Sequence, residues 1–238
     1  MGGGIYMDHP SDRPKYDTGK YRKNTLRQPE KTSSSTDDLI KESWQYGSSA
    51  RKQTLYTIRD YLAYPEDQRV ELINGVFYAM AAPTIIHQMV SAQLWMMINS
   101  YILEKGGPCL ALYAPVDVQL DKDDYTMVQP DVLVVCDPNR YKDGNRIYGA
   151  PDFIAEILSP SNPSYDLGIK VSKYMNAGVR EYWVIDSTHE KVYVYVNEES
   201  LMIRIYSFED RVPMQVYQGD CVIDFRRIRS HLARYIES

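Results

Sequence analysis

The sequence lacks any long apolar run. Its 238 residues are 44% hydrophobic and 25% charged, which is the balance of a globular domain able to bury a substantial core. No window approaches the roughly 18 continuous apolar residues of a membrane helix. Residues 1–10 have no basic region followed by an apolar segment, so we expect no secretory signal. These absences predict a soluble, cytoplasmic protein without a membrane partner.

Cysteine is scarce as well. The three cysteines, Cys109, Cys136 and Cys221, are odd in number, far apart and in no CxxC pair. We therefore expect neither a disulfide scaffold nor a thiolate zinc site, and a reducing compartment is the default.

Positive charge is not in excess either. The net charge is −5, yet residues 1–53 hold ten Lys and Arg against seven Asp and Glu, and the remainder holds 17 against 25. A domain this acidic is not built to wrap nucleic acid by neutralising many phosphates. It can still cut nucleic acid at a local site where carboxylates hold a metal ion.

Residues 1–53 contain few aliphatic side chains and show no sustained period of 2 or 3.6. We expect a disordered or loosely attached N-terminal arm there, and one folded domain over residues 54–238. Within the arm, residues 13–31 carry seven basic side chains against two acidic ones. This run is typical of a solvated tail, and a nucleic-acid-binding arm is the other interpretation.

The domain alternates helical and strand patterns. The Asn74-Gly75 pair is a strong hairpin signal, because both residues must take positive φ, and the apolar spacing after Thr84 is helical. We expect a mixed central sheet flanked by helices, an α/β or α+β fold. The expected helices cover 57–64, 84–103, 165–177 and 226–236; the expected strands cover 70–73, 76–80, 110–120, 131–136, 153–158, 181–186, 191–197, 201–206 and 212–217.

Three carboxylates fall within apolar strands. Asp131 opens a buried run after Pro130, Glu156 shares a strand face with Ile154 and Leu158, and Glu71 lies in the hairpin. Each also has an ordinary interpretation by itself. Asp131 can be a strand-end or turn carboxylate, Glu156 can pair with an Arg or Lys, and Glu71 can be an exposed strand residue. An ionised carboxylate among apolar neighbours is costly unless it is paired or binds a metal.

A lysine-bearing helix follows these strands. At about 100° per residue, Lys170 borders the apolar arc, whereas Lys173 lies further toward solvent. Lys170 can therefore reach a half-buried site, or it can form a weak helix pair with Asp166. Two carboxylates and an ammonium group suit metal-assisted phosphodiester hydrolysis, with Mg²⁺ or Mn²⁺ held by carboxylate oxygens.

Other hydrolase and nucleotide-binding patterns are missing. The sequence has no G-x-S-x-G elbow, and neither His189 nor His231 has an evident nucleophile partner. It also has no phosphate-binding P-loop and no dinucleotide glycine fingerprint.

Seven segments occur in the order found in one bacterial family. They are Glu71-Leu72-Ile73-Asn74-Gly75, His87-Gln88, Ala114-Pro115-Val116-Asp117-Val118, Gln129-Pro130-Asp131, Glu156-Ile157-Leu158-Ser159-Pro160-Ser161, Asp166-Leu167-Gly168-Ile169-Lys170 with Tyr174, and Ala177-Gly178-Val179-Arg180-Glu181-Tyr182-Trp183. From about residue 54 to 186, the chain resembles the Uma-two family of restriction endonucleases, within the PD-(D/E)XK nuclease superfamily.

The resemblance implies roles for particular residues. Asp131 resembles the first metal-binding aspartate and Glu156 the acidic residue of the second motif, with the backbone carbonyl of Ile157 as a further ligand. Glu71 resembles the acidic residue that assists the metal. The standard motif would place a lysine where this chain has Leu158. The family resembles branches of the superfamily in which the lysine lies on the following helix, and Lys170 matches that position.

Three further residues match family motifs. His87 is either a structural histidine or a group that binds phosphate or transfers a proton near the metal. Asp117 is expected to line the site, and Tyr174 to pack with its polar tip.

The leading hypothesis is a Mg²⁺-dependent DNA endonuclease of restriction-endonuclease-like fold. The alternative is a noncatalytic nucleic-acid-binding or regulatory module on a decayed nuclease scaffold, and a third is hydrolysis of another phosphorylated substrate. A homodimer fits a nuclease that cuts both strands. The tyrosines from Tyr182 to Tyr217 would furnish its interface or, as we favour, complete the sheet core.

Overall fold

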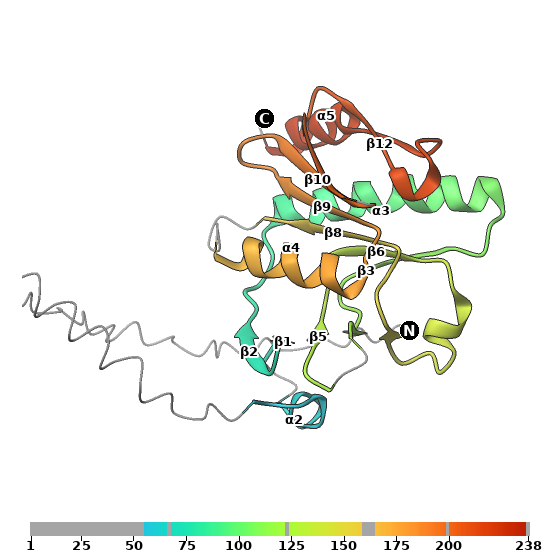
Figure 1. Ribbon diagram of the computed structural model, residues 1–238. Coiled ribbons are helices and arrows are strands. Elements are labelled where there is room, and N and C mark those ends of the chain that lie inside the picture. The colour runs from blue at the N-terminus through green and yellow to red at the C-terminus, as the bar shows by residue number, and fades with distance from the viewer. Residues whose placement is uncertain (1–54, 66–67, 122–123, 159–164, 199, 237–238) are drawn as a thin grey trace, which may run out of the picture. The chain divides into compact units, whose positions relative to one another are not determined.

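The computed structural model describes residues 55–65, 68–121, 124–158, 165–198 and 200–236, with backbone alone at 165–167. The expected arm, residues 1–53, lies outside this part of the chain. The described residues form a mixed α+β fold with two principal sheets (Figure 1). The predicted fold class, a mixed sheet flanked by helices, is confirmed.

The larger sheet has six strands in the order β11-β10-β9-β8-β6-β3. All neighbours are antiparallel except β8 and β9, which are parallel and are joined through a helix, as a parallel pair requires. The strands are β3 (Leu110–Tyr113), β6 (Val132–Val135), β8 (Phe153–Ile157), β9 (Glu181–Asp186), β10 (Lys191–Asn197) and β11 (Leu201–Ser207).

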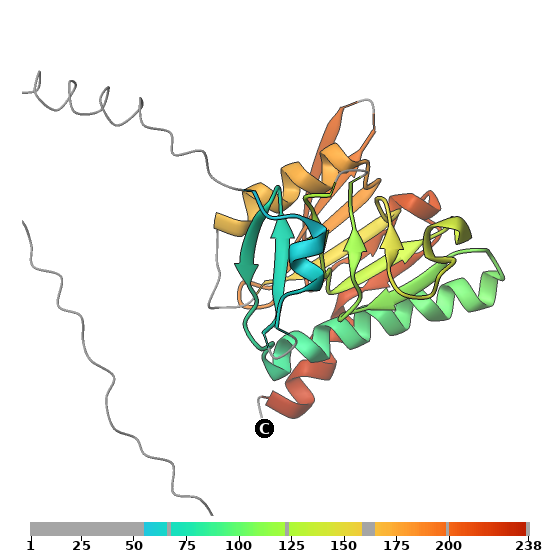
Figure 2. The ribbon, with the colours of Figure 1, turned by 90° about the horizontal axis from the view of Figure 1, so that it is seen from below.

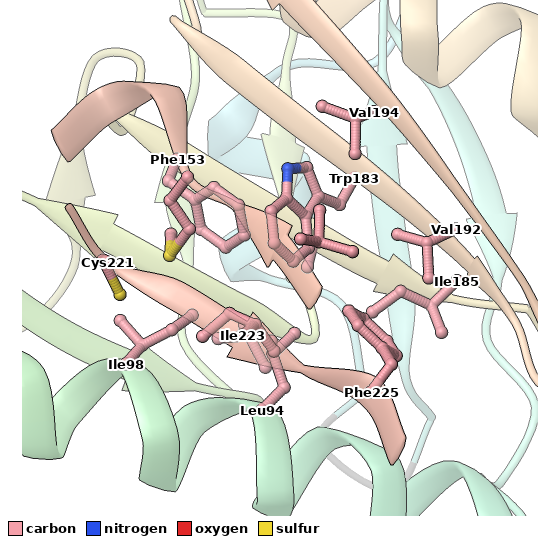
Figure 3. Packing of buried hydrophobic residues seen from close by; sticks show 14 of the residues in the cluster. Leu94, Ile98, Phe153, Trp183, Ile185, Val192, Val194, Cys221, Ile223 and Phe225 are labelled. Atoms are coloured by element: carbon pink, nitrogen blue, oxygen red, sulfur yellow. The ribbon is translucent and has the colours of Figure 1, made fainter. Parts of the chain in front are cut away.

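Helices cover both faces of this sheet. Helices α3 (Ile85–Lys105) and α5 (Phe225–Ile236) lie on one face and α4 (Tyr165–Ala177) lies on the other (Figure 1). On the α3 side, Phe153 and Trp183 meet edge to face at 5.3 Å between ring centroids. Leu94 and Ile98 from α3 complete the packing around the two rings (Figure 3).

The smaller sheet lies across the α4 side of the larger one (Figure 2). Its order is β2-β1-β5-β4-β7, with β1 (Val70–Ile73), β2 (Val76–Ala79), β4 (Val118–Gln119), β5 (Met127–Val128) and β7 (Ile147–Tyr148). The chain passes from β5 in the smaller sheet to β6 in the larger one through Gln129, Pro130 and Asp131. This crossing brings the first candidate aspartate to the boundary between the sheets.

Local signals in the sequence are confirmed where they act at short range. Thr57 caps α2 (Ile58–Leu62) in a capping box with Asp60. Asn74 and Gly75 have φ of 49° and 77° in the β1–β2 turn. Helix α3 begins after its cap, Thr84, and ends at Gly106 in the left-handed conformation.

Some predicted strands are wrong in extent. Pro115 cannot donate to a ladder, so the expected strand 110–120 divides into β3 and β4. Likewise Pro213 ends β12 (Arg211–Pro213), and a 3₁₀ turn, η2 (Gln215–Tyr217), replaces the rest of the expected strand 212–217. The prediction did not include β5, β7, β13 (Val222–Asp224) or the 3₁₀ turn η1 (Pro138–Tyr141). Strands of two residues are too short to show a period.

The cysteine spacing led us to expect no disulfide scaffold, but the described residues contain a disulfide bond. Cys109 and Cys136 are joined, and Cys221 is free and buried. The cause is strand register: Leu110 pairs with Val135, so Cys109 and Cys136 face each other just beyond the ends of β3 and β6. Sequence spacing does not reveal this pairing, because the two cysteines are 27 residues apart.

The tyrosines of the later strands belong mainly to the core, as we favoured. Tyr182 is fully buried, and Tyr193, Tyr195, Tyr206 and Tyr217 are partly buried against the two main hydrophobic clusters. The homodimer remains a prediction. Within the described residues, we find no helix with the length and apolarity needed to cross a membrane.

Substitution of Gly75 tests how strongly the hairpin turn is constrained. A Cβ at Gly75 would lie 2.7 Å from Leu55 Cβ at a φ of +77°, whereas a Cβ at Gly106, with φ +68°, would meet nothing within 4 Å. Both alanine variants incur the left-handed backbone cost of about 1–2 kcal/mol. We therefore expect Gly75→Ala to lower the free energy of unfolding more than Gly106→Ala does, as measured by urea denaturation. Equal losses would show that the contact with Leu55 relaxes without cost.

Candidate functional site

The residues predicted to act in catalysis or to hold the metal ion line one cavity of about 330 Å³. Its wall comes from the β1–β2 hairpin, the first turn of α3, the end of β8 and the middle of α4. Strands β1 and β8 belong to different sheets, so the cavity lies at the boundary between the sheets. The predicted residues among those lining it are Glu71, His87, Asp131, Glu156, Ile157 and Lys170.

Strand register brings the two principal carboxylates together. Strands β6 and β8 are antiparallel, with Val132 opposite Ala155. Continuing this register by one residue places Asp131 opposite Glu156, on the face that α4 covers. Residues opposite each other on such a pair have Cβ atoms about 4.5–5.5 Å apart. Two acidic residues that are distant in sequence thus meet in the cavity.

Asp131 is oriented from two sides. His87 Nε2 lies 3.0 Å from Oδ2 of Asp131, and the backbone N–H of Ile157 donates to the same oxygen at 2.8 Å. Burial works against a charged His87, but the hydrogen bond and charge of Asp131 outweigh it and raise the pKa of His87. Neither contact uses Oδ1 of Asp131.

Glu156 is almost completely buried and accepts two hydrogen bonds on one oxygen. Lys170 Nζ lies 3.0 Å and Tyr174 OH 2.8 Å from Oε1. The pKa of Glu156 is raised to about 7, chiefly by burial; the negative charges of Asp131 and Glu71 also raise it, whereas Lys170 lowers it. Tyr174 packs as expected: its ring is fully buried, and its hydroxyl group donates the hydrogen bond to Glu156.

Lys170 lies between two carboxylates. Its Nζ is 2.8 Å from Glu71 Oε2 and 3.0 Å from Glu156 Oε1. Burial alone would lower the pKa of Lys170, but these two negative charges raise it well above the usual value, so the side chain is an ammonium ion. Lys173 instead pairs with Asp121 outside the cavity. The expectation that Lys173 lies further toward solvent is wrong, because its side chain is 14% exposed and that of Lys170 is 17% exposed. The side chain of Asp166, the other expected partner, lies outside the described residues.

Glu71 is buried rather than exposed on its strand. Its Oε1 accepts from the backbone N–H of Gln129 at 2.9 Å, and its Oε2 binds Lys170. Because both carboxylate oxygens have partners, Glu71 is better arranged to anchor Lys170 than to hold a metal ion.

The donor set fits a hard divalent cation held by two side chains. Among the described residues, Asp131 Oδ1 and Glu156 Oε2 have no hydrogen-bond partner, and no three His, Cys, Asp or Glu side chains form a metal cage. Mg²⁺ typically binds through one or two carboxylates and fills its octahedron with water and phosphate oxygens. A cation would also relieve the excess negative charge that raises the pKa of Glu156.

Sequence reasoning missed three polar residues at this site. Arg69 and Tyr182 line the cavity, and Tyr182 OH is buried with no hydrogen-bond partner in the described part of the chain. Gln129 supports Glu71 through its backbone N–H. Its position next to Pro130-Asp131 is the feature of the sequence that could have indicated a role at the site. Asp117, expected to line the site, does not; its Oδ1 instead accepts from Tyr61 and Gln129.

Known proteins resemble the chain over most of the folded domain. Residues 58–222 match the family model described as "Uma2: Putative restriction endonuclease". An uncharacterised Synechocystis protein, slr1290, is 29% identical over 162 residues, which cover 66% of this chain and 83% of that protein.

A solved structure shares the fold. The crystal structure of a "putative nuclease belonging to DUF820" from Anabaena variabilis superposes with a TM-score of 0.62 at 21% identity. The match covers 74% of this chain and 98% of that one. Because the family model spans more than half of the sequence and the predicted motifs meet in one cavity, the chain belongs to the Uma2 family.

Proposed function

We propose that this protein is a Mg²⁺-dependent nuclease that hydrolyses phosphodiester bonds of DNA. One observation carries the proposal: Asp131 and Glu156 lie on neighbouring strands in the same cavity as Lys170. The description of the Uma2 family as restriction endonucleases, and that of the Anabaena protein as a nuclease, support the same reaction class.

Asp131 and Glu156 are the residues that would hold the metal, through the oxygens that lack hydrogen bonds. When bound, Mg²⁺ (or Mn²⁺) supplies a lowered pKa for a coordinated water and positive charge beside the phosphate. His87 and the Ile157 N–H fix the orientation of Asp131, and Tyr174 fixes that of Glu156. Such supporting hydrogen bonds hold metal ligands in position.

Lys170 adds a positive charge from the protein to that of the metal ion. Its ammonium group faces the cavity and is held by Glu71 and Glu156. There it orients the attacking water and stabilises negative charge on the phosphate oxygens as the P–O bond to water forms. The attacking water gives up a proton as its oxygen bonds to phosphorus, and the bond to the leaving oxygen breaks. The leaving oxygen takes up a proton, and the products are a phosphomonoester and an alcohol.

Metal binding by the two carboxylates is the first prediction. We expect calorimetric titration of Mg²⁺ or Mn²⁺ into the wild type to saturate at one site, and Asp131→Asn and Glu156→Gln to lose this binding. Each variant should also lose DNA cleavage by at least about 100-fold, since the oriented water is lost. A wild type without metal affinity, even after DNA is added, would favour the noncatalytic alternative. Metal binding with cleavage of only non-nucleic phosphodiesters would indicate the third hypothesis.

Lysine substitution separates catalysis from metal binding. We expect Lys170→Met to retain metal binding and to lower kcat by roughly 10²–10³-fold, because the charge beside the phosphate is removed. Lys173→Met, on the same helix but outside the cavity, is the matched control and should cleave at the wild-type rate. Equal activity of both variants under single-turnover conditions would contradict the role of Lys170.

Glu71 should behave as a lysine anchor. In Glu71→Gln, the amide oxygen can still accept from Gln129 N–H, but the ion pair with Lys170 is lost. We expect metal affinity within about twofold of wild type and a fall in kcat of about 10–100-fold, the usual range for supporting residues. Loss of metal binding as severe as in Asp131→Asn would make Glu71 a ligand instead.

A further inference from the structure

Arg69 lines the cavity, and the described residues use little of its hydrogen-bonding capacity. It directly precedes β1, and its backbone carbonyl is fixed by the N–H of Met80 at 2.9 Å. Its guanidinium makes one hydrogen bond to another described residue, from Nη2 to Gln129 Oε1 at 3.1 Å. A guanidinium carries five N–H donors in a planar fork, so several remain for a ligand.

Gln129 accepts the hydrogen bond that positions this guanidinium. Its side-chain Nε2 donates to Tyr61 OH at 3.1 Å and to Asp117 Oδ1 at 2.9 Å. Tyr61 OH donates to the same Asp117 oxygen at 2.8 Å. With the amide nitrogen committed to these two acceptors, the amide oxygen is left to accept from Arg69. The network therefore fixes the orientation of Gln129 and, through it, the position of Arg69.

Arg69 differs from Lys170 in the charges around it. The ammonium of Lys170 is bound to two carboxylates, whereas Arg69 has no carboxylate partner among the described residues. The first turn of α3 reaches the same cavity with His87 and Gln88, and it contains no acidic residue. Its positive helix end adds to the potential of Arg69, so this side of an otherwise acidic cavity attracts anions.

We propose that Arg69, positioned by Gln129, forms a phosphate-binding subsite for the backbone of the nucleic acid whose cleavage is proposed above. A planar guanidinium with spare donors matches two phosphate oxygens. The subsite reads no base, because phosphate contacts fix register and orientation and carry no direct sequence information. It rests on the proposed function for the identity of the polyanion, and it uses none of the metal-binding residues.

Binding of a fluorescein-labelled DNA duplex, measured by polarisation over a series of salt concentrations, tests the subsite. The full chain is used, with Ca²⁺ in place of Mg²⁺. We expect Arg69→Gln to weaken binding about 5–10-fold and to reduce the slope of log K against log salt by about one, the effect of losing one phosphate contact. Arg69→Lys should lie between it and wild type. Arg211→Gln, an exposed arginine on β12 outside the cavity, is the matched control and should change neither quantity.

Gln129→Met tests the positioning role. Alone it should weaken DNA binding about 2–5-fold, and in the Arg69→Gln background it should add nothing, because the two residues act as a unit. An equal effect in both backgrounds would overturn the link between Gln129 and Arg69. Wild-type affinity and salt slope in Arg69→Gln would overturn the subsite and leave the proposed nuclease standing.

Metal binding measured separately distinguishes a failure of the Arg69 subsite from a failure of the proposed nuclease function. Calorimetric Ca²⁺ binding by each variant shows whether the carboxylate site survives the substitution. A wild type that binds Ca²⁺ but no DNA would overturn the subsite and the choice of DNA as substrate together, whereas the metal site would stand.

Discussion

The ion pair of Lys170 with Glu71 and Glu156 holds the candidate site together. Its three residues come from α4, β1 and β8, so one ammonium group links a helix and a strand from each sheet. Removing an ion from water costs several kcal/mol, and the attraction repays that cost only with good geometry and further hydrogen bonds. Here Tyr174 and the Gln129 N–H supply those bonds. Oε2 of Glu156 still has no hydrogen-bond partner among the described residues, and negative charge remains in excess, which suits a cation-binding site.

The parts of the fold that sequence could predict are those with local causes. The Asn74-Gly75 turn and the helix that starts after Thr84 depend on residues close together in the sequence, and they were predicted correctly. The helix angle also indicated Lys170 rather than Lys173 as the lysine that reaches the cavity. It did not predict that Asp121 would bury Lys173 in an ion pair, because that contact depends on tertiary packing. Segments interrupted by Pro115 and Pro213 were predicted too long, because apolar content continues past the point where the ladder ends.

Contacts set by strand register could not be predicted. Nothing in the spacing of Asp131 and Glu156 shows that they face each other, and the same holds for Cys109 and Cys136. The strand patterns pointed to the carboxylates, and the family resemblance assigned them to one metal site. It supplied no role for Gln129 or Arg69, whose contacts depend on how the two sheets meet. Contacts between residues that are far apart in the sequence are therefore the part of the site that the sequence did not predict.

The crossing of the chain between the two sheets at Gln129-Pro130-Asp131 has a consequence for cooperativity. Glu71 belongs to the smaller sheet and Glu156 to the larger one, so neither sheet contains a complete site. A subglobal opening that parts the sheets while leaving both intact would separate the anchor from the lysine. The candidate site therefore depends on the boundary between the two sheets, and an opening at this boundary would disrupt the site while each sheet stays folded.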